Sequence, residues 1–380
     1  MTFYFGPYSS LLLIFFVHLL VFSGLVLRKS ILNDSKADRW LSTLLFLGAV
    51  FIAPWMLGFG GWYGEQPYRD ILFYVPFNHA LLIGPVVYFY VQAQLNPDFR
   101  LQKHQYWHFI PAILWVVLHV VMVVIDKLIL GRYYFLVSEQ DPDFADWYQF
   151  VSLISLIGYL ALTYRYYAHY QKFIFQMVSN ADAVRFGWIR NFLIAFLAFV
   201  VLTLVFIVMP LLGIPLDYQG SWWYFFFFGF LFYYISIEGF SNIKTNKIAF
   251  EELSKQIETE ATTPRTQVIE DLEFWKAKVL KNVVEEQSFI NPELSLPDLA
   301  KSLRTNPSFL SKVVNQGFGQ NFNDFINEKR VLAVTQKLKA GEQKQLTLLA
   351  IAYDCGFNSK ATFNRAFKKV TGQSPKDFDS

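Results

Sequence analysis

Seven long uncharged runs in the first 240 residues limit the possible folds of this chain more than any other feature. Each run is long enough, or nearly long enough, to cross the hydrocarbon core of a bilayer. Lipid offers no hydrogen-bond partner to backbone amides and carbonyls, so each run is expected to be a helix. The runs cover residues 7–27, 40–60, 71–95, 107–125, 147–164, 191–209 and 221–237. The sequence therefore predicts an all-α protein that begins with a seven-helix transmembrane bundle over residues 1–240.

Basic residues gather on one side of this bundle. The first, third and fifth connecting segments carry ten lysines and arginines, namely Arg28, Lys29, Lys36, Arg39, Arg100, Lys103, Arg165, Lys172, Arg185 and Arg190. The second, fourth and sixth carry three basic residues and eight acidic ones. The positive-inside rule then places the N-terminus outside the membrane and the C-terminus in the cytoplasm. This orientation needs an odd number of spans, and seven runs supply it.

The first run is expected to stay in the mature protein, because it lacks the basic leading segment and the cleavage site of a signal peptide. Tryptophans at the ends of several runs are typical of an interfacial belt. The aromatic stretch 222–228 is denser than a belt requires. We expect it to face lipid, with a ligand-binding cage as the alternative.

Polar residues inside the runs are the candidates for sensing, because burying them in lipid is costly. Asn78 and His79 lie in the middle of the third run, between Pro76 and Pro85. They form either a ligand pocket or proton-sensitive switch, or only interhelical hydrogen bonds that hold the bundle together. The ligand itself is unknown and could be a small molecule or a lipid. His104 and His108 have the spacing of a helical metal site, but no acidic third ligand is near, so no metal site is predicted.

Residues 241–267 differ abruptly from the apolar half and form a charged linker that contains the breaker sequence Ala261-Thr-Thr-Pro264. A new helix is expected from Val268, with an apolar stripe at Ile269, Leu272, Trp275, Val279, Leu280 and Val283. The stripe packs on the following domain or, alternatively, makes a dimer contact. The expected domains are thus residues 1–240 (transmembrane sensor), 241–267 (linker) and 268–380 (DNA-binding).

Two helix-turn-helix patterns follow in tandem. In the first, Ser295 can cap a helix carrying Leu299 and Leu303, and Pro307 suits the first turn of the next helix. The inward residues are Leu299, Leu303, Leu310 and Val313. One rigid helix over residues 321–340 is expected to join the two units.

In the second unit Ile351 and Ala352 lie on the first helix, Gly356 supplies the tight turn and Ser359 caps the second helix. Phe363, Ala366, Phe367 and Val370 are expected to face inward. The single cysteine, Cys355, stands in this apolar setting and is expected to be buried as a small hydrophobic residue.

The second helix of each unit has the composition of a recognition helix that enters the major groove. Its expected DNA-contacting residues are Ser308, Ser311, Lys312 and Asn315 in the first unit, and Lys360, Ala361, Asn364, Arg365 and Lys368 in the second. Lysine and arginine can contact guanine or phosphate, and asparagine can contact adenine. The net charge of +3 alone would not indicate a nucleic-acid partner. The prediction depends on where the basic residues stand.

The last hundred or so residues resemble the AraC/XylS family of transcription regulators. The resemblance is carried by Leu299-Ala300, Leu310-Ser311, Ile326-Asn327, Arg330, Ile351-Ala352, Gly356-Phe357-Asn358-Ser359, Phe363, Ala366-Phe367-Lys368, Gly372 and Pro375. Val314 and Phe378 depart from the usual aromatic residue and tyrosine, respectively. The resemblance implies a bipartite reader of double-stranded DNA that recruits or blocks RNA polymerase, often as a dimer. It also implies a bacterial inner-membrane location for a member with a multi-span sensor.

These patterns predict a membrane-bound, one-component transcription regulator without catalytic residues or cofactors. A signal in or outside the membrane would act on the DNA-binding domain through helix packing and the linker. The alternative is a membrane enzyme or transporter with a regulatory DNA-binding tail. It would need a catalytic or ion-pathway constellation, and the runs contain only scattered histidines and asparagines.

Overall fold

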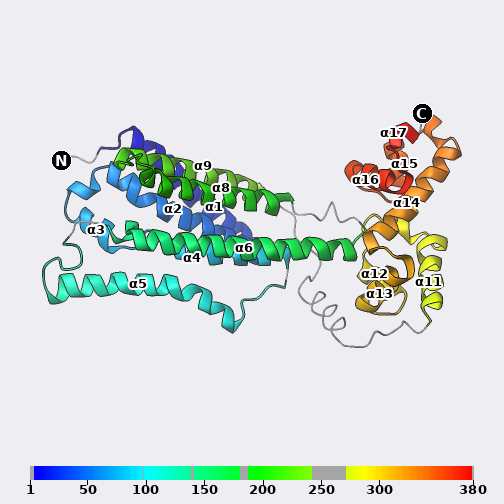
Figure 1. Ribbon diagram of the computed structural model, residues 1–380, viewed down its shortest axis with the longest axis horizontal. Coiled ribbons are helices and arrows are strands. Elements are labelled where there is room, and N and C mark those ends of the chain that lie inside the picture. The colour runs from blue at the N-terminus through cyan, green and yellow to red at the C-terminus, as the bar shows by residue number, and fades with distance from the viewer. Residues whose placement is uncertain (1–3, 97, 138–140, 180–186, 242–270, 379–380) are drawn as a thin grey trace. The chain divides into compact units, whose positions relative to one another are not determined.

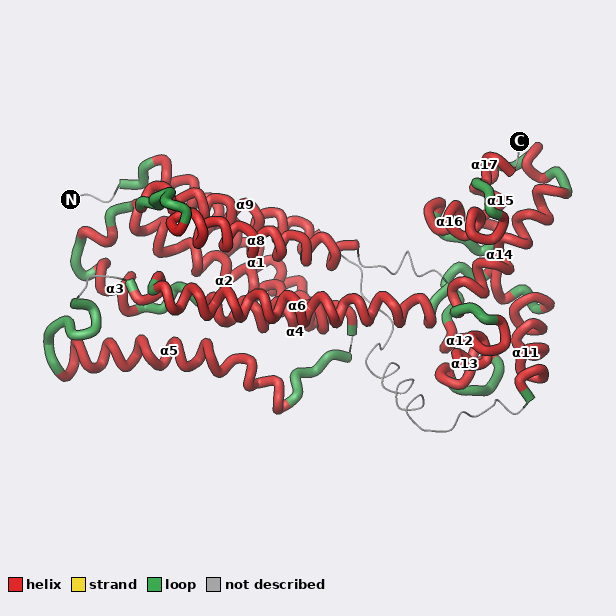
Figure 2. Tube along the Cα trace, in the orientation of Figure 1, coloured by secondary structure: helices red, strands yellow, loops and turns green. Residues whose placement is uncertain are grey.

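The computed structural model describes residues 4–96, 98–137, 141–179, 187–241 and 271–378, and the linker 241–267 lies almost wholly outside them. In these residues every regular element is helical, and no β-strand occurs (Figures 1 and 2). The chain forms two compact units. The first contains Met1–Tyr167 and Gly187–Ile248, and the second contains Ala168–Phe186 and Ala249–Ser380.

The N-terminal unit is built from long apolar helices. They are α1 (Pro7–Asn33), α2 (Lys36–Phe59), α3 (Tyr68–Tyr74), α4 (Ala80–Leu95), α5 (Ile110–Val123), the first part of α6 (Asp146–Met177), α8 (Gly187–Leu211) and α9 (Tyr218–Ser241). By length and composition, six helical stretches of the described chain can cross a membrane: α1, α2, Lys103–Ile129 around α5, α6, α8 and α9. The all-α prediction is confirmed, with apolar helices first and the helix-turn-helix units last.

The third apolar run does not form one helix. Residues 75–79 separate α3 from α4, and α4 is a shorter apolar helix of 16 residues. Pro76 has no amide hydrogen and disfavours helical backbone at Val75, which is extended (φ −87°, ψ 120°). The prediction of a continuous helix over 71–95 is therefore wrong, and Asn78 and His79 lie in the break rather than within a helix.

Aromatic packing fills the interior of the N-terminal unit. Helix α2 contacts α1, α4 and α9. At the contact with α9, a Cβ atom on Gly48 would lie 2.5 Å from the Phe232 ring, so the two helices approach as closely as glycine allows. In the stretch 222–228, Phe225 and Phe228 are buried while Phe227 is 45% exposed. The expectation of a lipid-facing stretch is therefore wrong for its buried half.

Besides the end of α6, the described residues of the C-terminal unit form ten helices and helical turns. They are α11 (Leu272–Leu280), η5 (Lys281–Glu285), η6 (Ser288–Ile290), α12 (Leu296–Ser302), α13 (Pro307–Phe318), α14 (Phe322–Lys339), η7 (Glu342–Lys344), α15 (Leu348–Asp354), α16 (Lys360–Thr371) and α17 (Pro375–Phe378). Helix α14 is central, because it contacts α13 on one side and α15 and α16 on the other (Figure 1). The expected connecting helix over 321–340 is thus present as α14.

Candidate nucleic-acid interface

The first helix-turn-helix unit is α12 followed by α13. The Ser295 hydroxyl accepts a hydrogen bond from the Asp298 amide and caps α12, as expected. Asn306 caps α13 in the same way through the amide of Phe309 (2.6 Å), and Pro307 takes the first helical position. The inward leucines of both helices are buried. The two caps and the small apolar core together fix the angle between α12 and α13.

The second unit is α15 followed by α16. Gly356 makes the turn with φ +91°, and a Cβ atom there would lie 2.6 Å from the Phe289 carbonyl oxygen. Ser359 stands at the N-cap of α16, but its side chain makes no capping hydrogen bond among the described residues. The core consists of Val331, Val334, Leu338, Ile351, Ala352, Cys355, Phe357, Phe363, Ala366 and Phe367. Burial raises the pKa of the Cys355 thiol to about 11, which suits a packed rather than a reactive cysteine.

One face of α16 is exposed and basic. Its side chains Lys360, Ala361, Asn364, Arg365 and Lys368 are all exposed. Their spacing of one, four, five and eight positions places them within about 140° of the helix circumference, at 100° per residue. The structure therefore brings together on one surface all five residues that the sequence assigned to this recognition helix.

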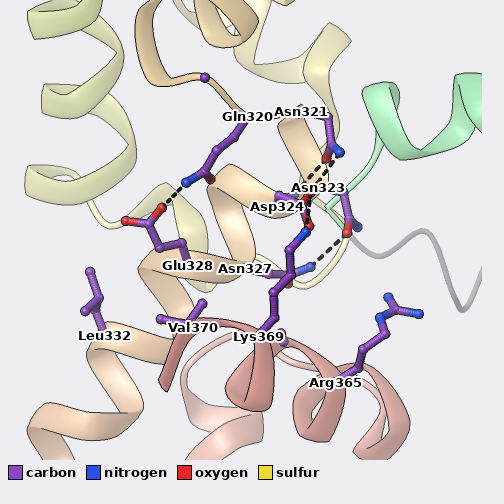
Figure 3. Close-up of a pocket in the computed structure, with 12 residues that line it drawn as sticks. Gln320, Asn321, Asn323, Asp324, Asn327, Glu328, Leu332, Arg365, Lys369 and Val370 are labelled. Atoms are coloured by element: carbon purple, nitrogen blue, oxygen red, sulfur yellow. Dashed lines mark hydrogen bonds and ion pairs between the residues drawn. The ribbon is translucent and has the colours of Figure 1, made fainter. Parts of the chain in front are cut away.

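Lys369 and Val370 of α16 lie outside this group of five residues. Lys369 forms an ion pair with Asp324 of α14 (2.8 Å) and so helps to hold α16 in place. Val370 is 38% exposed, so its predicted inward position is wrong. It lines a hollow of about 610 Å³ between α14 and α16, in which amide and carboxylate side chains of α14 are hydrogen-bonded to one another (Figure 3). Arg365 stands apart from that hydrogen-bonded group, and its guanidinium lies 5.9 Å from the centre of the Phe175 ring.

Helix α13 presents less of the expected surface. Asn315 is exposed and Lys312 is half-buried, but Ser308 and Ser311 are 4% and 6% exposed. Their expected outward orientation is wrong in this structure. Helix α13 packs against α11, α12 and α14. Trp275 of α11, for example, lies edge-on to Phe309 at 5.0 Å.

Arg330 of α14 is the largest fully buried side chain of the described chain. Its guanidinium donates to the carbonyl oxygens of Phe289 and Asn291 (both 2.8 Å), to the Ser179 hydroxyl (2.9 Å) and to the Asn327 amide oxygen (3.2 Å). Burial lowers the pKa of Arg330 to about 10, so it remains charged at neutral pH. Uncharged acceptors therefore satisfy a buried cation at the junction of the two helix-turn-helix units.

Residues 178 and 179, which follow α6, belong to the C-terminal unit, a feature that sequence patterns did not indicate. Ser179 donates from both its amide and its hydroxyl to the Leu294 carbonyl (3.1 and 2.8 Å). Its own carbonyl accepts from the Asn323 amide (2.9 Å). The segment 178–179 thus takes part in the hydrogen bonding of the C-terminal unit, although 115 positions separate Ser179 from Leu294 in the sequence.

The sensing candidates Asn78 and His79 lie beside a buried carboxylate. The Asn78 amide group donates to the Asp143 carbonyl (2.9 Å), and the backbone amides of Phe77 and Asn78 donate to the Asp143 carboxylate (2.6 and 2.9 Å). His79 is half-buried at the N-cap of α4. The hydrogen bonds between Asn78 and Asp143 therefore stabilise the backbone of the segment between α3 and α4. Among the described residues, no group of three or more His, Cys, Asp or Glu side chains could hold a metal ion. His108 instead contacts the Tyr159 hydroxyl (2.6 Å).

Two helix-turn-helix units on one rigid central helix define a DNA-binding protein of the transcription-regulator class. Residues 299–380 match a family model described as a helix-turn-helix domain, and they form an AraC-type domain. The chain is 30% identical over 104 residues to an uncharacterized transcriptional regulatory protein, YesN, of Bacillus subtilis. It is also 30% identical over 92 residues to the transcriptional activator RhrA of Rhizobium meliloti.

Each of these similarities covers only part of the chain. The YesN match covers 27% of each chain, and the RhrA match covers 24% of this chain and 29% of RhrA. A protein of unknown function from Listeria innocua is 28% identical, with a TM-score of 0.24, and the match covers 27% of this chain and 93% of that one. The chain thus spans less than a third of the length of these curated relatives.

Proposed function

We propose that this chain is a membrane-bound, one-component transcription regulator controlled by a signal sensed in or outside the bilayer. The observation that carries the proposal is the exposed basic face of α16 on a chain whose described residues also include six apolar helical stretches of membrane length. A single polypeptide with both parts can pass a signal to a promoter without a phosphotransfer partner. RNA polymerase and a second copy of the chain are the further partners expected of such a regulator.

For DNA recognition, we assign base contacts to Asn364 and Arg365 and backbone contacts to Lys360 and Lys368, with Ala361 close to the bases. All five lie on the exposed face of α16. On α13 the accessible candidates are Lys312 and Asn315. Because Ser308 and Ser311 are buried, their contact with DNA would require α13 to be uncovered.

For the membrane, we propose seven crossings, with the N-terminus outside and the DNA-binding unit in the cytoplasm of a bacterial cell. Six helical stretches meet the length requirement, and the split pair α3 and α4 would make the third crossing. The break is compatible with lipid, because the backbone amides of residues 77 and 78, which lie outside a helix, bond to Asp143. A reporter fused after Lys247 should be cytoplasmic, whereas periplasmic activity of that reporter would reverse the orientation.

For the control of DNA binding, we propose that α6 contributes together with the linker. The boundary between the two compact units falls within α6, and Ser179 just beyond it bonds to Arg330. A signal that shifts α6 would act on the connecting helix of the DNA-binding unit. The signal must bind the two states of the protein with different affinity to have this effect.

The test of DNA recognition uses the full chain in lipid nanodiscs and genomic duplex fragments. We expect affinity to fall steeply with salt, since phosphate contacts release counterions. Arg365→Ala should cost about 1–3 kcal/mol on the specific site if Arg365 contacts a base. Lys344→Ala, which changes an exposed lysine away from α16, should leave the affinity unchanged. Absent or salt-insensitive binding would refute DNA recognition, and equal affinity of the R365A variant would remove Arg365 from the interface.

A further inference from the structure

The N-terminal unit contains an aromatic cavity to which neither the sequence patterns nor the comparisons assign a role. Its volume is about 730 Å³, which is within the range of small-molecule sites. Eight of its fifteen lining residues are aromatic, among them Trp55, Tyr63, Trp115 and Tyr218. These four residues come from different parts of the sequence, so the cavity exists only when α2, α5 and α9 are packed together.

Asp141 places a carboxylate in the wall of this cavity. One of its oxygens accepts from the Tyr63 hydroxyl (3.0 Å), and the other accepts from the Asp143 backbone amide (3.0 Å). Among the described residues Asp141 forms no ion pair, although Arg69 also lines the cavity. The carboxylate is therefore positioned by neutral donors, without a cationic partner in the described part of the chain.

The backbone amide of Asp143 is hydrogen-bonded to Asp141, and its carboxylate, when ionised, adds to the local negative charge. Asp143 is 1% exposed, and its nearest basic group is His119, whose Nε2 lies 3.8 Å from a carboxylate oxygen. Burial, and then the charge of Asp143, raise the pKa of Asp141 to about 7. A half-buried carboxylate with a strongly raised pKa in a concave site is typical of ligand-binding positions. A cation in the cavity would offset the cost of ionising it.

We propose that this cavity binds an organic cation, a protonated amine or a quaternary ammonium group, with the cationic head against Asp141 and its substituents against the aromatic walls. Aromatic faces and a carboxylate are the two groups that attract such cations in proteins. An anionic ligand would meet two lining carboxylates, Asp141 and Asp146, against one guanidinium, Arg69. This inference rests on the proposed function, because the bound cation would be the signal that controls the proposed regulator.

The cavity also connects to the break in the third run. Trp115 lines the cavity and donates from its indole nitrogen to Asp143 (3.2 Å), and the same Asp143 carboxylate holds the backbone of residues 77 and 78. A cation that changes the hydrogen bonding of Asp141 would therefore act two residues from Asp143, whose carboxylate fixes the start of α4. This arrangement gives binding a route to helix packing.

The test is titration calorimetry of the full chain in nanodiscs with three probes of similar shape. They are choline, its neutral analogue 3,3-dimethylbutan-1-ol and the anion 3,3-dimethylbutanoate. We expect saturable binding of choline alone. Asp141→Asn should weaken choline binding by roughly tenfold or more, because it removes the charged partner. Asp34→Asn, a change at an exposed aspartate paired with Arg39, should leave binding unchanged.

Binding of the neutral or anionic probe at least as tight as that of choline, or no choline binding, would overturn the proposal. Equal choline affinity in the D141N variant would do so too. If that variant does not fold, the three probes on the unmodified chain still decide. DNA binding is measured on the same nanodiscs. A preparation that binds DNA but not choline refutes only the cation site, whereas one that does not bind DNA refutes the proposed function.

Discussion

Replacing Arg330 by methionine tests whether the buried guanidinium holds the DNA-binding unit together. Methionine fills much of the same volume but cannot donate, so the four acceptors of the hydrogen bonds between 2.8 and 3.2 Å lose their partner. Burying unsatisfied acceptors costs about 1–3 kcal/mol each, partly offset because a buried charge is also removed. We expect a net loss of about 3–5 kcal/mol, the range seen when one partner of a buried charged network is removed.

Hydrogen exchange of α14 in the full chain, followed by mass spectrometry, measures this loss directly. A cost of about 3–5 kcal/mol corresponds to an exchange rate that rises by roughly two to three and a half orders of magnitude. The matched control is Lys339→Met, which changes an exposed cation at the end of the same helix and should alter exchange little. An increase of less than about tenfold for Arg330→Met would show that the surrounding acceptors find other donors, and the assigned role of Arg330 would be refuted.

Two further substitutions test the turn of the second unit and the acid in the cavity. Gly356→Ala should destabilise the DNA-binding unit by more than about 2 kcal/mol, because the new Cβ atom would meet backbone oxygens. Gly372→Ala is the control, because Gly372 has a similar φ of +80° but open space around it. This control should cost only the backbone strain of about 1–2 kcal/mol. Denaturant titrations of both variants check this, and equal losses would exclude a steric cause. The raised pKa of Asp141 means that folding favours its protonated form, so ionisation destabilises the N-terminal unit as pH rises from about 4 towards 7. Asp141→Asn should therefore raise the melting temperature more at pH 8 than at pH 5, and a gain that does not change with pH would contradict the assignment.

Features that depend on neighbouring residues were predictable from the sequence. Ser295 and Pro307 stand where the helix signals placed them, and Gly356 makes the turn that only glycine tolerates at φ +91°. The five exposed residues of α16 followed from helical periodicity alone, because that helix has one buried and one open face. The apolar character of the N-terminal unit likewise needed no knowledge of packing.

Features that depend on distant residues were not predictable. The break between α3 and α4 is stabilised by Asp143, which lies 66 positions from Phe77. Ser308 and Ser311 are buried, and the pattern within one helix does not show which of its faces other segments cover. The aromatic cavity around Asp141 is assembled from several helices, and only the excess of aromatic residues hinted at it.

The hydrogen bonds of Ser179 have a practical consequence for engineering chimeric regulators from this chain. A chimera joined in the linker, with residues 268–380 fused to a foreign receptor, would leave behind the hydroxyl and carbonyl that Arg330 and Asn323 bind. Such a fusion would carry an incomplete polar core and should be prone to proteolysis even if its recognition helices are unchanged. Transplanting the short stretch around residues 168–179 as a second graft would supply the missing groups.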